Sequence, residues 1–170
     1  CTKDVFELLK ENEADTRWTF NVRALRDKLP GVAGGELCII FARPETGKTA
    51  SHVSFCYGSD GFAEQGASVH TFVNEEKATR TMLRAMSAFT GITKEEIYED
   101  PKFVANEWRT IHDNVNMYDA QGVTIEQIDA YCENHKPDVL VVDQLDKVQV
   151  AGNFSRTDEK LREIYTQARE

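Results

Sequence analysis

Short, uninterrupted apolar runs alternate with longer stretches in which apolar residues recur at helical spacing. Four segments are predicted as strands: residues 36–42, 67–73, 116–118 and 138–143. Runs that lack polar alternation are typical of strands buried on both faces of a parallel sheet, as we expect for residues 36–42 and 138–143. Helices between such strands predict an α/β fold with a parallel sheet and right-handed crossovers.

Helical periodicity and capping residues predict the helices. The expected helices are residues 4–13, 48–57, 75–90, a short one after Thr93, 101–113, 124–135 and 157–170. Glycines Gly58 and Gly91 end two of them, and Thr93 with Glu96 has the pattern of a capping box, in which each side chain bonds the other's backbone N–H. One face of helix 75–90 is expected in the core: Met82, Ala85, Met86 and Phe89. Residues 15–35 are of mixed pattern, with five expected anchors: Trp18, Phe20, Val22, Leu25 and Leu29.

Composition and charge narrow the class of protein. The 170 residues carry 29 acidic and 20 basic side chains, a net charge of −9, so contact with nucleic acid must be confined to particular loops. No apolar run is long enough to span a membrane and the first residues lack the pattern of a signal peptide, which favours the cytoplasm of a bacterial or phage-infected cell. The chain starts without methionine, so we expect a piece of a longer product. The cysteines have no zinc-ligand spacing and are predicted to be buried or half-buried thiols: Cys1, Cys38, Cys56 and Cys132.

The strongest chemical signal lies between the first apolar run and the helix at 48–57. The sequence matches the phosphate-binding loop pattern GxxxxGK[ST] at every fixed position but the first, where Ala42 replaces glycine. The expected nucleotide-binding residues are Ala42, Arg43, Pro44, Glu45, Thr46, Gly47, Lys48, Thr49 and Ala50. Backbone N–H groups of such a loop form an anion cradle. Lys48 would then reach the β- and γ-phosphates of a nucleoside triphosphate, and the Thr49 hydroxyl would bind Mg²⁺.

Two carboxylates follow predicted strands and complete this chemistry. Asp143 ends the run 138–143, where a nucleotide fold places a partner of Mg²⁺, usually through water, although an aspartate there also simply starts a turn. Glu75 follows the strand that ends at Val73, and it is the candidate base that activates the attacking water. The alternative for Glu75 is an acidic residue that favours the first turn of a helix because of the helix dipole.

These motifs resemble the DnaB-type replicative helicase motor. The resemblance lies in Gly34-Gly35-Glu36, in residues 37–50, in Phe72-Val-Asn-Glu75-Glu76, in Val141-Val-Asp143-Gln-Leu145 and in the helix from Thr157. Gln144 and Asp146 depart from the family's pattern, whereas alanine is common in the family at the position of Ala42. The resemblance implies a RecA-like core at residues 18–170 after a helix or linker at 1–17. It also implies hydrolysis of ATP or another NTP with Mg²⁺, 5′ to 3′ translocation on single-stranded DNA, and a hexameric ring of identical chains.

Two further expectations come from the same resemblance. The loop 147–156, which follows the strand of Asp143, would contact single-stranded DNA through Lys147, Asn153 and Arg156, unless it is a solvent loop without a partner. RecA-like cores also place a later strand between the phosphate-loop strand and the strand of Asp143. No such strand is predicted before Glu170, so we expect a core truncated after the magnesium-binding strand, with the two strands facing each other across a gap. Sensor and arginine-finger residues would lie further on.

Two other functions stay open at this point. A RecA-like recombinase or related ring ATPase would share the same loop and strands, but it would exchange DNA strands instead of unwinding them. A regulatory module would bind the nucleotide without turnover. Phosphate release measured with and without single-stranded DNA distinguishes a motor from a module.

Overall fold

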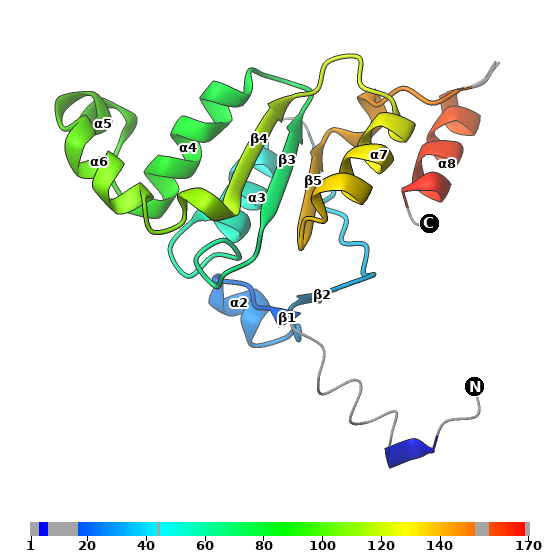
Figure 1. The fold of residues 1–170 in the computed structure, drawn as a ribbon, viewed down its shortest axis with the longest axis horizontal. Helices are drawn as coiled ribbons and strands as arrows, with labels where there is room; N and C mark the ends of the chain where they lie inside the picture. Colours follow the sequence, from blue (N-terminus) through cyan, green and yellow to red (C-terminus); the bar gives the residue numbers. More distant parts are fainter. Residues whose placement is uncertain (1–3, 7–16, 44, 152–156, 169–170) are drawn as a thin grey trace.

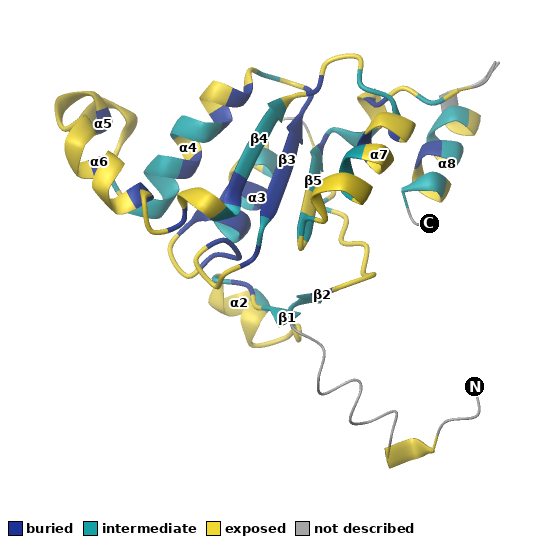
Figure 2. Ribbon diagram, in the orientation of Figure 1, coloured by how far each residue is buried: buried dark blue, intermediate teal, exposed yellow. Residues whose placement is uncertain are grey.

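The fold centres on a parallel sheet of three strands. The computed structural model describes residues 4–6, 17–43, 45–151 and 157–168. The strands are β3 (Val69–Val73), β4 (Val115–Asp119) and β5 (Val139–Asp143), in the order β4-β3-β5. Val73, the last residue of β3, is in register with both Asp119 and Asp143. The three carboxyl ends therefore meet at one edge, with β3 in the middle and buried along its whole length (Figure 2).

Helices cover both faces of this sheet (Figure 1). On one face, α3 (Lys48–Tyr57) and α4 (Ala78–Thr90) pack against each other, and Val53 and Ala85 share a core cluster with Val69. On the other face, Ile125 and Ile128 of α7 (Ile125–His135) join a second cluster around Phe72. Alternate residues of β3 thus serve opposite faces, as the period of a strand requires. The predicted α/β layers and parallel sheet are confirmed.

Side-chain caps start several of the helices, including the predicted one at Thr93. The capping box of Thr93 and Glu96 is formed at the start of α5 (Lys94–Glu99), and Asp100 caps α6 (Pro101–Trp108). Thr124 forms a second box with Gln127. The short 3₁₀ helices η1 (His112–Asn114) and η2 (Leu145–Lys147) and the last helix, α8 (Thr157–Gln167), complete the order. Of the predicted helical face of α4, Ala85 is buried and Met82, Met86 and Phe89 are partly buried against the core.

The predicted strand at residues 36–42 is wrong. These residues form no ladder with any described strand, and most of them are exposed (Figure 2). Leu37 is 45% exposed, Ile39 58% and Phe41 96%. An apolar run becomes a buried strand only when a neighbouring strand satisfies its backbone and helices cover its faces. Among the described residues neither condition is met, and the absence of pairing with β5 agrees with the expected gap between the two segments.

β5 is also less buried than its sequence predicts. One edge pairs with β3, whereas the other has no strand partner among the described residues, and Leu140 is 39% exposed. Cys38, which lies in the unpaired segment 36–42, is exposed, so its predicted burial is wrong. Cys56 is buried and Cys132 half-buried, as predicted. Cys1 lies outside the described residues.

A small antiparallel pair precedes the segment 36–42. It joins β1 (Arg17–Trp18) to β2 (Val32–Ala33), with the short helix α2 (Arg23–Arg26) between them. Phe20 is buried and Trp18 and Leu25 pack against the core, but Val22 and Leu29 are exposed and do not serve as the predicted anchors. The expected helix 4–13 is described only at residues 4–6, and the boundary after residue 17 falls within β1 and stays a prediction. Among the helices described, none has the length and apolarity needed to cross a membrane.

Candidate nucleotide site

The loop before α3 ends at Gly47, whose backbone is left-handed, and the helix begins at the next residue. Gly47 caps α3 with φ +94° and ψ 20°, a conformation that favours glycine because other residues pay a steric penalty there. A Cβ at Gly47 would meet nothing within 4 Å, so the glycine is required by the backbone and not by crowding. Gly47 stands at the start of α3, where the N–H groups of the first turn have no partners within the helix. This arrangement suits an anion.

The two residues after Gly47 reach the end of β5. The Thr49 hydroxyl donates to Asp143 Oδ2 at 3.3 Å, and Lys48 Nζ lies 3.6 Å from Asp143 Oδ1. Asp143 is buried, with 3% of its surface exposed, so its carboxylate is stable there only with such partners. Lys48 and Thr49 therefore lie beside Asp143, which follows Thr49 by 94 positions in the chain.

The rest of the predicted loop lies on the surface. Thr46 bonds back to the carbonyl oxygen of Arg43 through both its backbone N–H and its hydroxyl. Glu45 has φ +62°, outside the usual range for its type. The exposed residues of the set are Ala42, Arg43, Glu45, Thr46 and Ala50, and Pro44 lies outside the described residues.

Glu75 lies on the turn 74–77, which follows β3 at the same sheet edge as Asp143. Its side chain is exposed, and no hydrogen bond to it occurs among the described residues. Glu76, by contrast, accepts from the Thr81 hydroxyl at 3.0 Å and from Arg84 Nη1 at 2.5 Å, through the same oxygen. Glu75 is thus the carboxylate on this turn that is available to a ligand.

His52 is a member of this region that the sequence analysis did not assign. It follows Lys48 by four positions and Thr49 by three, so it shares their side of α3. It is 5% exposed, and its Nε2 has no hydrogen-bond partner among the described residues. Burial is the main cause that lowers the pKa of His52; the charges of Asp143, Lys48, Glu76 and Arg84 also act on it. The spacing of His52 from Lys48 can be read from the sequence, but it indicates a place near the site only once His52 is known to be buried.

The predicted DNA-contacting loop is described only at its start. Lys147 ends η2 and is exposed, whereas Asn153 and Arg156 lie outside the described residues. The chain between them is tied to α7, because Gln149 N donates to Val123 O at 3.0 Å and Gln149 O accepts from Ile125 N at 2.9 Å. Lys147 therefore lies after the carboxyl end of β5, next to a backbone segment that is hydrogen-bonded to the start of α7.

Comparison with known proteins identifies the family. The sequence profile of the DnaB-like helicase C terminal domain matches residues 19–170. Among solved structures, the chain is similar to one described as "The Structure Of A DnaB-Like Replicative Helicase And Its Interactions With Primase", with a TM-score of 0.59 and 17% identity. That likeness covers 75% of this chain and 33% of the other, so the chain spans a third of that structure's length. No match was found among curated proteins.

The fold and these matches define a RecA-like α/β core. The chain belongs to the DnaB-like helicase C-terminal domain family.

Proposed function

We propose that this chain is the NTP-hydrolysing motor of a DnaB-type replicative helicase, which uses ATP or another NTP to translocate on single-stranded DNA. The observation that carries the proposal is the meeting of Lys48 and Thr49 with the buried Asp143 at the open end of the sheet. A cation, a hydroxyl and a carboxylate converge there beside a helix N-terminus, which is the set that phosphoryl transfer needs.

Each residue has a stated role in this proposal. Lys48, 29% exposed in its side chain, leaves Asp143 and binds the β- and γ-phosphates, while the N–H groups that follow Gly47 hold the phosphate oxygens. The Thr49 hydroxyl and the Asp143 carboxylate, 3.3 Å apart, offer the oxygen ligands that Mg²⁺ prefers, with Asp143 acting through water. Bound Mg²⁺ would neutralise charge on the phosphates. Glu75 accepts a proton from the attacking water.

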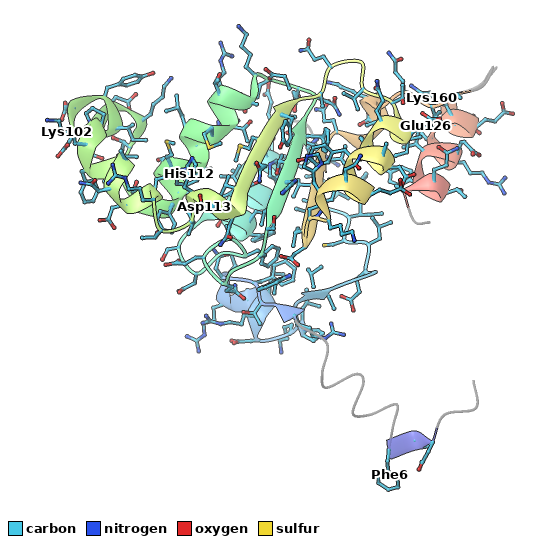
Figure 3. All side chains as sticks on the ribbon, viewed as in Figure 1. Phe6, Lys102, His112, Asp113, Glu126 and Lys160 are labelled. Carbon is cyan, nitrogen blue, oxygen red and sulfur yellow. The ribbon has the colours of Figure 1, made fainter. Side chains whose placement is uncertain are left out.

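The family favours a helicase over a recombinase, and turnover separates a motor from a regulatory module. In the complete protein, Lys48→Ala should abolish NTP hydrolysis with the fold intact. Glu75→Gln should retain nucleotide binding and lower turnover by roughly a hundredfold or more. Lys102→Ala is the matched control, because Lys102 is exposed on α6, away from the sheet (Figure 3). Near wild-type hydrolysis by Lys48→Ala would refute the assignment, and nucleotide binding without hydrolysis by the wild type would support the module.

The proposal also covers DNA binding and assembly. Lys147, Asn153 and Arg156 would contact the DNA backbone from the inner rim of a ring of identical chains, six in the complete protein. Replacing Lys147 and Arg156 by alanine should weaken single-strand affinity and flatten its salt dependence by about two phosphate contacts. An unchanged slope would show that the loop does not touch DNA.

A further inference from the structure

The turn 74–77 is fixed to the sheet at both ends. At its start, Val73 ends β3 between Asp119 and Asp143, and its carbonyl oxygen accepts from Ala120 N at 2.9 Å. At its end, the N–H of Ala78, the first residue of α4, donates to Asp119 Oδ1 at 2.6 Å. Both ends of the turn are thus tied to the carboxyl end of β4.

A third contact fixes the middle of the turn. Oε1 of Glu76 accepts from Thr81 and from Arg84, which are three residues apart on one side of α4. The Glu76 side chain is 13% exposed and that of Arg84 54%. The dipole of α4 does not account for this contact, because Glu76 bonds side chains, whereas the free N–H of Ala78 is taken by Asp119.

Glu76 also lies close to the candidate nucleotide site. The charges of Glu76 and Arg84 act on the same buried His52 as those of Asp143 and Lys48. Glu75, the neighbour of Glu76, is exposed and without a hydrogen bond among the described residues. Glu76 is therefore held by hydrogen bonds, whereas the side chain of Glu75, the preceding residue, is exposed.

We propose that Glu76 is a positioning residue: its bonds to Thr81 and Arg84 fix the turn 74–77 so that the Glu75 carboxylate points at the attacking water. This inference rests on the proposed function. Catalysis by a positioned carboxylate depends on its orientation, and a misplacement of about 1 Å can cost about a hundredfold in rate. A turn held at three points limits such displacement, whereas a turn held only at its ends does not.

The test is made in the complete protein with Glu76→Ala and Arg84→Ala. We expect kcat to fall by at least about tenfold while the nucleotide Kd stays within about twofold, because positioning affects the transition state more than the bound substrate. Arg84→Lys, which keeps the charge, should retain part of the activity. Arg80→Ala is the matched control, since Arg80 is exposed on the same helix, and it should leave kcat unchanged.

A purely structural role is excluded by repeating Glu76→Ala in a Glu75→Gln background. A residue that acts through Glu75 has nothing left to position there, so kcat should fall no further. Arg84→Ala, which removes one of the two donors to Glu76 Oε1, replaces Glu76→Ala in this cycle if the latter does not fold.

Three outcomes overturn the proposal. One is a folded Glu76 variant whose kcat stays within twofold of the wild type. Another is a Glu76→Ala substitution that lowers kcat by the same factor in the wild type and in the Glu75→Gln background. In either case the proposed function stands, because the wild type turns over and Glu75→Gln does not. A Glu75→Gln protein with normal turnover would refute the role of Glu75 and with it the inference about Glu76.

Discussion

Two segments of this molecule carry similar aliphatic side chains and reach the same site, yet they are held in different ways. β5 brings Asp143 to the site through a backbone ladder with β3, in register from Val139 to Asp143. Residues 36–42 approach the phosphate loop with no ladder among the described strands, and Phe41 is 96% exposed. On the loop side, Lys48 and Thr49 contact Asp143 of β5. The difference shows that an aliphatic run supplies the capacity to form a strand, while a neighbouring strand decides whether it does.

The largest expected difference between the two regions is in stability. Phe72 of β3 is 6% exposed in the core under α7, so Phe72→Ala should lower the free energy of unfolding by about 3–5 kcal/mol. Phe41→Ala removes the same side chain from a surface position and should change it by at most about 0.5 kcal/mol. Urea denaturation of both variants measures the contrast. A cost above about 1.5 kcal/mol for Phe41→Ala would mean that the segment 36–42 packs in solution.

Thiol labelling tests the same contrast without altering either segment. Cys56 is 3% exposed, and burial raises its pKa to about 12, so little reactive thiolate forms at pH 8. Cys38 is exposed. Iodoacetamide should therefore modify Cys38 at least about a hundredfold faster than Cys56. Mass spectrometry of the labelled peptides gives both rates. Slow labelling of Cys38 would indicate that its segment is covered.

A smaller effect is expected where α3 meets β3. The hydroxyl of Tyr57, near the end of α3, bonds that of Thr71 on β3, and both residues are fully buried. Tyr57→Phe leaves the Thr71 hydroxyl without this partner and should cost about 1–3 kcal/mol. Adding Thr71→Val removes both polar groups, so the double variant should recover much of that loss. Additive losses in thermal or urea unfolding would show that the two hydroxyls do not depend on each other.

The contrast also marks how far the sequence alone can predict this fold. Helix ends were predictable because capping residues act locally: Thr93 with Glu96 and Gly91 specify their turns whatever surrounds them. The strand β3 was predictable within residues 67–73, whereas its complete burial, which includes the polar His70 and Thr71, depends on its central place in the sheet. The exposure of residues 36–42 was not, because burial of a strand depends on partners far away in the sequence.

The same reasoning applies to the candidate site. Gly47, Lys48 and Thr49 could be assigned from their spacing, since the chemistry of phosphate binding fixes that spacing. Their contact with Asp143 required the register of the sheet. The burial of His52 and the bonds of Glu76 to Thr81 and Arg84 depend on how α3 and α4 pack, which the sequence does not display. A buried histidine is recognised only when its surroundings are known.

The smallest effect we expect is a pH dependence on the α7 side of the paired sheet. His70 of β3 is 5% exposed; its Nδ1 lies 2.6 Å from the Tyr131 hydroxyl and its Nε2 lies 3.1 Å from the Asn116 amide nitrogen. Burial lowers the pKa of His70 below its ordinary 6.5, and the charge of His135 acts in the same direction. An amide N–H can donate only to an unprotonated ring nitrogen, which fits the neutral form.

The sign of the effect follows from that lowered pKa. Because the folded state binds the proton less readily than the unfolded state, the stabilising contribution of neutral His70 is complete above about pH 6.5 and is lost as the pH falls through the lower, folded pKa. The slope is at most about 1.4 kcal/mol per pH unit for one group. The free energy of unfolding, measured with urea, should therefore decrease as the pH is lowered from 7.5 to roughly 5. The variant His70→Gln should show a smaller decrease. His52, also lowered by burial, contributes in the same window, so the difference between the two proteins isolates His70. An NMR titration of the His70 ring with a midpoint at or above 6.5 would show instead that water and protons reach the paired face of the sheet as freely as they reach the segment 36–42.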